Sequence, residues 1–382
     1  MADANTAAGS TAAAPRSKPR AITPGRPILA PSDQDTGATE IALLLGSDLG
    51  TSRSSIVSMN GARKTVESYV GYAKDPVSRK YLKTDVIYGK AALDNRLAVE
   101  LYRPLEKGVI KFWGGKGDKE AEERKNLKAA QDLLQHLVDL AHPGRGDVLF
   151  GVVGVPSRAS AENKQAMLEA ARNVLDSVMI VSEPFTVAYG MERMSDILVV
   201  DIGAGTTDLC RMHGTVPSEE DEVSYTIAGD AIDTKLMELI KAKHPDAQVT
   251  QNMCKGWKEQ YGFVSDARDK VEVTAPINGK PTPLDITNEM RAACDTLVPP
   301  IVEGIQRLVA TFNPEFQEKL RHNVLLSGGG GLMRGLNKRI EDAMKDYGGA
   351  RVTVVDEPLY AGANGALQLA IDMPGEYWQQ LR

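Results

Sequence analysis

In this chain of 382 residues, the segment DIGAGTTD at Asp201–Asp208 is the most informative about fold and function. It lies between two apolar runs, Ile197–Val200 and Leu209–Met212, so the pattern predicts a β-hairpin with this segment at its turn. Glycine lets backbone N–H groups approach an anion closely, and consecutive N–H groups in such a turn form an anion-binding nest. Thr206 and Thr207 add hydroxyl donors. The turn is therefore a candidate phosphate site.

A similar hairpin opens the globular part of the chain. The apolar run Ile41–Leu45 leads to the turn Asp48-Leu49-Gly50-Thr51-Ser52, and Ser54–Met59 is typical of the returning strand. Asp48 and Asp201 are 201 − 48 = 153 positions apart, which is too long for a solenoid repeat. The spacing instead indicates two related domains whose hairpin turns face a shared cleft.

Either turn alone is weak evidence for a phosphate site, because a plain β-hairpin can have the same residues, but the pair favours phosphate binding. Two facing turns could hold a polyphosphate from both sides. Asp48 and Asp201 would then lie beside the phosphates. Mg²⁺ prefers carboxylates, substrate phosphate oxygens and water, so both residues are candidate metal ligands.

The remaining apolar segments predict an α/β fold. Val148–Val155 and Val178–Val181 have the composition of buried strands, and Ala161–Leu175 has that of an amphipathic helix. Strand, helix and strand in this order form the unit of sheets covered by helices. Farther along, a strand, a helix, a strand and a helix are predicted in turn at Asn323–Leu326, Leu332–Met344, Val352–Val355 and Ala361–Ile371.

Two further motifs have open interpretations. Four glycines follow Ser327, between a predicted strand and a predicted helix. They form either a flexible turn or a place where a flat group or a phosphate passes against bare backbone at a helix N-terminus. Glu183 follows a predicted strand, and Pro184 suits the first turn of the next helix. The Glu183 carboxylate either orients an attacking water or is simply stabilised at the helix N-terminus by the helix dipole.

Composition narrows the class of protein. The hydrophobic fraction of 42% suffices for two domains, and the net charge of −6 argues against a general nucleic-acid binder. Cys210, Cys254 and Cys294 show no CxxC pairing, so we expect reduced thiols rather than a zinc site or a disulfide framework. Neither a membrane-spanning apolar run nor a signal peptide is evident, and we expect a cytoplasmic protein.

Two polar segments remain. Residues 1–40 are rich in Ala, Thr, Ser, Gly and Pro, which predicts a disordered tail. Its basic residues either attract an acidic partner or lipid surface or belong to a solvated tether. Gly114–Lys119 is basic and glycine-rich but lacks the GxxxxGK[ST] spacing of a P-loop, so it predicts a surface loop.

In these motifs the chain resembles the bacterial actin-like proteins, over about residues 41–380. The family's first phosphate loop is DxGT with a small hydroxyl residue, its second is DIGxGTTD and its adenosine loop is SGGG, which match Asp48–Ser52, Asp201–Asp208 and Ser327–Gly330. The resemblance implies an α/β actin-like ATPase fold, with two related RNase H-like domains around a nucleotide cleft. It places domain I at 41–193 plus 356–382 and domain II at 194–355.

The resemblance also implies a site, residue by residue. Glu183 falls on the family's catalytic Glu, with Asp201 and Thr207 positioning the water, while Asp48 and Asp201 hold Mg²⁺. ATP or ADP would contact Asp48, Gly50, Thr51, Ser52, Gly203, Ala204, Gly205, Thr206, Thr207, Lys255, Lys258, Ser327, Gly328, Gly329, Gly330 and Gly331. The family's nucleoside contacts come from an ExxK-like helix, in which Lys258 matches here and Lys255 replaces the acid.

The implied function is that of an ATP-hydrolysing cytoskeletal protein that polymerises into dynamic filaments. Gly154–Ser160, Val181–Phe185 and Tyr377-Trp378 point to the magnetosome-associated type, which positions and aligns these organelles, rather than to the MreB group at large. The expected partners are other copies of the chain and an organelle-linked adaptor protein, with no nucleic acid and no direct membrane insertion.

Three alternatives stay open. Another bacterial actin-like scaffold, for cell shape or partitioning, would share every motif and differ in its cargo. A sugar or acetate kinase of the same superfamily would need a base and a substrate pocket of its own, for which the sequence offers no clear candidate. A chaperone-type ATPase of the Hsp70 class would need a β-rich domain after the last family element, near which this chain ends at Arg382.

Overall fold

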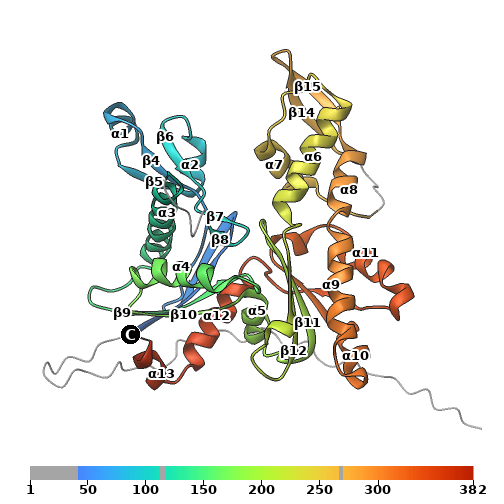
Figure 1. Cartoon of the computed structure of the whole chain (residues 1–382). Coiled ribbons are helices and arrows are strands. Elements are labelled where there is room, and N and C mark those ends of the chain that lie inside the picture. The colour runs from blue at the N-terminus through green and yellow to red at the C-terminus, as the bar shows by residue number, and fades with distance from the viewer. Residues whose placement is uncertain (1–41, 112–117, 266–269, 382) are drawn as a thin grey trace, which may run out of the picture.

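The structure, a computed structural model, describes residues 42–111, 118–265 and 270–381 (Figure 1). The predicted tail at 1–40 and Gly114–Gly117 of the predicted loop lie outside these residues. Asp118 and Lys119, which were predicted to belong to that loop, are the first residues of a helix, α3 (Asp118–Leu140). No helix within the described ranges is long and apolar enough to cross a membrane.

The first sheet has five strands in the spatial order β3-β2-β1-β9-β10. Their bounds are β1 Ala42–Leu49, β2 Arg53–Ser58, β3 Arg63–Glu67, β9 Val148–Val155 and β10 Ser177–Ser182. β1, β2 and β3 are antiparallel neighbours, whereas β9 and β10 run parallel to β1. The first part of β1, Ala42–Leu45, is apolar because both faces are covered: Leu43 and Leu45 pack with α3 and α4 (Ala161–Arg172), and Leu44 packs on the opposite side.

The second sheet repeats this topology in the order β13-β12-β11-β16-β17. Its strands are β11 Ser195–Ile202, β12 Thr207–His213, β13 Glu222–Tyr225, β16 Val324–Ser327 and β17 Val352–Val354. The first three are again antiparallel, and β16 and β17 again run parallel to the first strand. The sheets with their helices are called the first half and the second half below.

Two helices lie between the sheets, α5 (Glu183–Gly190) and α12 (Ala361–Asp372). They cross at glycines, since a Cβ added at Gly190 would lie 2.6 Å from Gly365 Cα. α12 also packs against β1 and β9, so the end of the chain returns to the first half. α5 packs against β11 and β12, which joins the two hydrophobic cores.

Each half carries further elements above its sheet, on the two sides of Figure 1. Those of the first half are β4 Val70–Ala73, β5 Val86–Tyr88, β6 Val99–Tyr102, β7 Leu105–Glu106, β8 Val109–Ile110, α1 Pro76–Leu82 and α2 Gly89–Asp94. Those of the second half are α6 Gly229–Lys243, α7 Gln251–Tyr261, α8 Thr287–Asp295, β14 Glu272–Ile277 and β15 Lys280–Asp285. α9 Val298–Ala310, α10 Pro314–Arg321, α11 Leu336–Ala343 and α13 Gly375–Gln380 complete the helices of the described residues.

The helix predicted at Leu332–Met344 is wrong in its first turn. Gly329–Leu332 forms a 3-10 turn, and α11 begins only at Leu336. Gly335 has φ +81°, which helical residues do not adopt, and Arg334 forms a β-bridge with Phe263 instead. The glycine run therefore leads into an irregular segment rather than directly into an α-helix.

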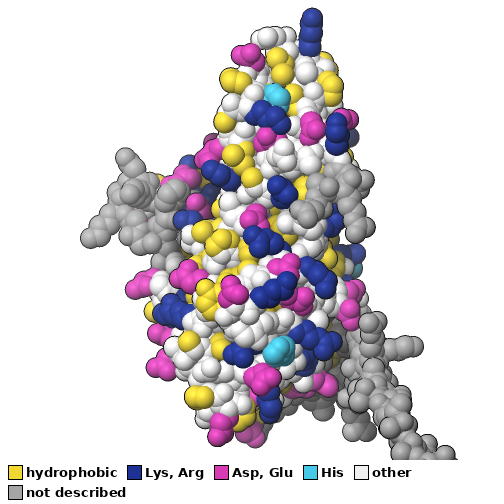
Figure 2. Space-filling model, turned by 90° about the vertical axis from the view of Figure 1, so that its right-hand side faces the viewer, with side chains coloured by type: hydrophobic (Ala, Val, Ile, Leu, Met, Phe, Trp, Pro, Cys, Tyr) yellow, Lys and Arg dark blue, Asp and Glu magenta, His cyan; other side chains and the backbone are white. Residues whose placement is uncertain are grey.

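The outer face of the second half, which includes α8, α10 and α11, is shown in Figure 2. Over the described part of this face, acidic and basic side chains are interspersed, and hydrophobic side chains are scattered among them.

Candidate nucleotide cleft

A cavity of about 460 Å³ lies between the two halves. The ends of parallel strands form its floor, because Asp48 is in register with Gly154 of β9 and Asp201 with Ser327 of β16. Ligands of open α/β sheets bind outside the carboxyl ends of such strands. Both predicted hairpins therefore present their turns to the same space.

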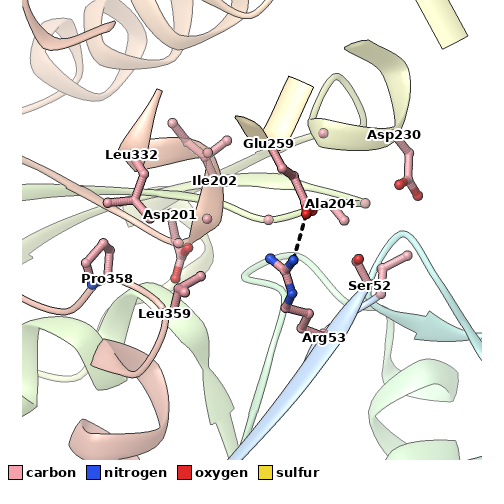
Figure 3. A pocket seen from close by; sticks show the side chains of 18 of the residues that line it. Ser52, Arg53, Asp201, Ile202, Ala204, Asp230, Glu259, Leu332, Pro358 and Leu359 are labelled. Atoms are coloured by element: carbon pink, nitrogen blue, oxygen red, sulfur yellow. Dashed lines mark hydrogen bonds and ion pairs between the residues drawn. The ribbon is translucent and has the colours of Figure 1, made fainter. Parts of the chain in front are cut away.

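Apolar side chains gather on one side of this cavity. In Figure 3, Leu332, Pro358 and Leu359 lie together on one side, and Arg53 and Glu259 lie on the other. Leu332 remains 55% exposed and Leu359 38% exposed, so the apolar side is open to a ligand. Ligand pockets commonly combine an apolar wall with a few placed polar groups.

The first hairpin turn is fixed by neighbours in its own half. Thr51 Oγ1 accepts a hydrogen bond from the Gly108 N–H at 2.7 Å, and Arg103 Nε donates to the Thr51 carbonyl at 2.8 Å. Gly50 has to be bare, because a Cβ there would lie 2.5 Å from the Arg53 carbonyl oxygen. These contacts hold the backbone of Gly50, Thr51 and Ser52 at the surface of the cavity.

The second hairpin turn is closed by its own backbone and held by a helix. The Gly203 N–H donates to the Thr206 carbonyl at 2.9 Å. The start of α6 docks on the turn, where the Gly229 N–H donates to the Gly203 carbonyl at 3.2 Å and the Asp230 N–H to the Ala204 carbonyl at 2.8 Å. The turn is thereby tied to the second half at two points.

Two glycines, Gly205 and Gly328, allow close approaches around the cavity. Gly205 meets the first half, since a Cβ there would lie 2.6 Å from Lys107 Cα. Gly328 has φ +71°, and a Cβ there would lie 2.5 Å from the Ile202 carbonyl oxygen and against the Asp201 carboxylate. Only glycine satisfies both the conformation and the space at Gly328.

Glu183 is the first residue of α5 and follows β10 directly, as the sequence predicted. It lies beside Gly154, where an added Cβ would be 3.2 Å from Glu183 Cγ. Pro184 occupies the first turn of the helix. The side chain lines the cavity rather than solvent, so both interpretations of Glu183 from the sequence are compatible with its place.

Three carboxylates, Asp48, Glu183 and Asp201, lie at the floor of the cavity, and a fourth, Asp208, is buried near them. Burial raises the pKa of Asp48 to about 6. Burial, and then the charges of Asp48, Asp208 and Asp201, raise the pKa of Glu183 well above its ordinary value. Burial, and then Asp48 and Asp208, do the same to the pKa of Asp201. These groups strongly disfavour being negatively charged together.

The carboxylates fit a divalent cation bound with a substrate. No ion pair within the described residues involves Asp48, Glu183 or Asp201. No group of three or more His, Cys, Asp or Glu side chains in that part of the chain is arranged to hold a metal ion alone. Asp48 and Asp201 offer hard oxygen ligands from the two halves, which suits Mg²⁺ because this ion also takes phosphate oxygens and waters.

Three polar contacts connect the walls of the cavity above its floor. They are Arg103–Asp230 at 2.8 Å, Arg53–Glu259 at 2.7 Å and Lys255–Ser52 at 2.6 Å, of which the second is dashed in Figure 3. Each joins a residue of the first half to α6 or α7 of the second. The walls are thus held together partly by contacts that a ligand could replace.

Lys258, one turn along α7 from Lys255, is used differently. Its Nζ pairs with the buried Asp233 at 2.7 Å and donates to the Gly229 carbonyl at 2.8 Å. Both partners belong to α6, whose start holds the second hairpin. Lys258 therefore supports the site through α6.

Most of the predicted site residues come together. Those that line the cavity are Asp48, Gly50, Thr51, Ser52, Glu183, Asp201, Gly203, Ala204, Gly205, Thr206, Lys255, Lys258, Gly328, Gly329 and Gly330. Thr207, Ser327 and Gly331 do not, because all three are buried beneath the surface of the cavity. The Thr207 hydroxyl donates to the Ile227 carbonyl at 2.8 Å. The roles predicted for all of the site residues, these three included, stay predictions.

Sequence reasoning missed several lining residues. They are Arg53, Asp230, Asp233, Glu259, Leu332 and Leu359. None belongs to a motif with a characteristic spacing, and Arg53 and Glu259 meet across 206 positions of sequence. The one usable signal is the acidic start of α6, where Asp230 and Asp233 follow Gly229.

Two phosphate-type hairpins, opposed across a cleft between two sheets of the same topology, define the actin-like class of nucleotide-binding folds. The family model for the MreB/Mbl protein matches residues 42–374. The chain therefore belongs to the MreB/Mbl family of actin-like proteins.

Known relatives agree with this assignment. The chain is 38% identical over 345 residues to the actin-like protein MamK of Paramagnetospirillum magneticum, covering 90% of this chain and 97% of the relative. The match to MamK of Magnetospirillum gryphiswaldense is also 38% identical, covering 90% and 93%. The structure matches that of a MamK double helical filament with a TM-score of 0.82 and 38% identity, covering 87% of this chain and 100% of that chain. MreB5 of Spiroplasma citri bound to ADP, at 21% identity and a TM-score of 0.70, shares the fold.

Proposed function

We propose that this protein binds ATP with Mg²⁺ in the cleft, hydrolyses it and polymerises into dynamic filaments, and that these filaments position magnetosomes through an adaptor protein. The observation that carries the proposal is the cluster of buried carboxylates between two phosphate hairpins, on a chain similar to a MamK filament subunit over nearly its whole length. A related MamK variant that does not polymerise was solved bound to AMPPNP, which supports a nucleotide in this cleft.

The proposed chemistry uses positioned charges and bare backbone. The turns of the two hairpins bind the phosphate chain from both sides through N–H groups and the hydroxyls of Thr51 and Thr206. Asp48 and Asp201 hold the cation, which would neutralise charge that develops on the phosphate oxygens. Glu183 orients the attacking water in line with the terminal phosphate, and catalysis rests mostly on positioning and electrostatic stabilisation.

Glu183 can do this only when its carboxylate is ionised. In the protein alone, burial and three neighbouring carboxylates raise its pKa well above the ordinary value. A positive charge held by Asp48 and Asp201 would favour the ionised form. The hydrolytic group would thus become active together with the metal-bound substrate.

The test is sedimentation of the full chain with Mg-ATP, with Mg-ADP and without nucleotide, beside Glu183→Ala, with phosphate release followed in the same samples. We expect Mg-ATP to drive both proteins into the pellet, and the variant to release phosphate about 10²- to 10⁴-fold more slowly. A wild-type chain that hydrolyses ATP but stays in the supernatant under every condition would overturn the filament part of the proposal. Pull-down of filaments with purified magnetosomes tests the organelle part separately.

A further inference from the structure

Among the described residues, the cavity lining includes four cationic side chains: Arg53, Lys255, Lys258 and Arg334. Three of them have charged or backbone partners in the protein: Arg53 pairs with Glu259 at 2.7 Å, Lys258 with Asp233 at 2.7 Å, and Arg334 donates to the Tyr261 carbonyl at 3.0 Å. Lys255 differs. It donates to the neutral hydroxyl of Ser52 at 2.6 Å and has no ion pair within the part of the chain that the structure describes.

Lys255 is also half-buried, so its charge has lost much of its water. This loss of solvation lowers the pKa of the Lys255 ammonium, and the neighbouring Arg53 and Arg103 lower it further against the opposing effect of Glu259. A neutral hydroxyl compensates a desolvated ammonium poorly, whereas an anion compensates it well. The position therefore favours a ligand that brings negative charge.

The contact between Lys255 and Ser52 indicates where the negative charge of the ligand would lie. Ser52 is the last residue of the first hairpin turn, the turn whose bare backbone faces the cavity. Lys255 lies on α7 of the second half and reaches this turn across the cavity. An anion bound at the turn would lie within reach of the Lys255 ammonium without any movement of α7.

We propose that Lys255 is a phosphate-binding residue for the nucleotide, which exchanges its contact with the Ser52 hydroxyl for a phosphate oxygen when the ligand binds. The phosphate chain then links the first hairpin to α7, in place of the direct contact between Ser52 and Lys255. This proposal rests on the proposed function of nucleotide binding. It separates Lys255, which contacts the ligand, from Lys258, which supports α6.

The test compares nucleotide and nucleoside affinity by titration calorimetry with Mg-ATP, Mg-ADP and adenosine. The variants are Lys255→Met, which keeps length and removes charge, and Lys255→Arg, which keeps charge. We expect Lys255→Met to weaken Mg-ATP and Mg-ADP about 10- to 100-fold, the range of a lost charge-assisted hydrogen bond. Adenosine should bind both proteins within about twofold, since it has no phosphate, and this also shows that the variant is folded. Lys255→Arg should stay within about threefold for all ligands.

The matched control is Lys235→Met on the exposed side of α6, where the lysine pairs with Glu238 at 3.6 Å. It should bind every ligand as the wild type does. Equal loss of adenosine and ATP affinity in Lys255→Met would overturn the phosphate role, as would unchanged ATP affinity or an equal loss in Lys255→Arg. A wild-type chain that binds no Mg-ATP would overturn the proposed function itself, so the two failures are distinguishable.

Discussion

The two phosphate hairpins have closely similar sequences, but the rest of the protein supports them differently. The second turn is held within its own half, by the Gly203–Thr206 hydrogen bond, by the start of α6 and by the bond from the Thr207 hydroxyl to the Ile227 carbonyl. The first turn is likewise held in its own half, by Gly108 and Arg103, but it also offers Ser52 to Lys255 of the other half. Ser52 and Thr207 both follow a threonine of their turn, yet one side chain faces the cavity and the other the protein interior.

This difference assigns different duties to the two turns. A turn fixed by buried hydrogen bonds keeps its shape whether or not a ligand is present. A turn that contacts the opposite wall changes partners when a ligand enters or the walls separate. We infer that both turns keep a fixed backbone, and that the Ser52 hydroxyl of the first hairpin changes its partner when phosphate binds.

The largest effect is expected for the two candidate metal ligands, Asp48 and Asp201. Their variants test whether both hairpins take part in metal binding. Asp48→Asn and Asp201→Asn each keep the shape of the side chain and remove its charge, so each should lower Mg-dependent ATP turnover about 10²- to 10³-fold and raise the Mg²⁺ concentration needed for half the maximal rate. Phosphate release across a Mg²⁺ titration measures both quantities. Asp94→Asn, at an exposed residue of α2 that pairs with Lys90, is the control. A normal rate in either variant would show that its hairpin takes no part in metal binding.

A second prediction concerns the tips of the turns. Gly205→Ala would place a methyl group 2.6 Å from Lys107 Cα, so the halves have to separate, and Mg-ATP affinity should fall about 10- to 100-fold. Gly203→Ala meets only the Thr206 carbonyl at 3.4 Å, and its loss should stay within about threefold. Gly256→Ala, with no atom within 4 Å, is the neutral control. Similar losses at Gly203 and Gly205 would mean that cleft closure is not what limits binding.

The sequence predicted the hairpins well because their signals are local. An apolar run ending in Asp and Gly fixes both the strand and its turn, and the strands at Val148–Val155 and Val324–Ser327 lie where the apolar runs placed them. The order of these elements, together with the family resemblance, was enough to predict two similar sheets around a cleft. The predicted domain boundaries themselves are not tested by these observations.

The contacts across the cleft could not be predicted in this way. Lys255 and Ser52 are 203 positions apart, and a pairing at that distance depends on how two complete halves dock. Thr207 shows a second limit: DIGxGTTD fixes the residue type, but the direction of the side chain depends on the Ile227 carbonyl of a later segment. The break at Gly335 shows a third, since one glycine at positive φ overrides a pattern that is otherwise helical.

The third prediction concerns pH. The pKa of Asp48 is raised from its ordinary value to about 6, and that of Asp201 is raised well above its own. A raised native pKa means that the folded state holds more protons than the unfolded chain, so the stability of the ligand-free protein should fall as pH rises. For Asp48 this loss lies between about pH 4 and pH 6, and for Asp201 it extends to higher pH.

Urea unfolding of the ligand-free chain at pH 5.5 and pH 7.5 measures this effect. The free energy of unfolding should be lower at pH 7.5, and the difference should shrink more in Asp201→Asn than in Asp48→Asn because pH 5.5 already lies near the pKa of Asp48. Mg-ATP should reduce the difference in the wild type, since a bound cation favours the ionised carboxylates. Greater stability at pH 7.5 than at pH 5.5 without ligand would contradict the assigned electrostatics of the cleft.

The smallest expected effect separates the two hydroxyls that follow the threonines of the turns. Thr207→Val removes a donor to the Ile227 carbonyl and should lower the free energy of unfolding by about 1–2 kcal/mol, while ATP turnover stays within about tenfold of the wild type. Ser52→Ala removes only the hydroxyl that Lys255 contacts and should change the stability of the ligand-free protein by less than about 0.5 kcal/mol. Thr215→Val, at an exposed threonine, is the control for the loss of a hydroxyl. If Thr207→Val instead abolishes turnover at unchanged stability, then Thr207 acts on the water as the family resemblance implied, and its side chain turns toward the cavity during the reaction.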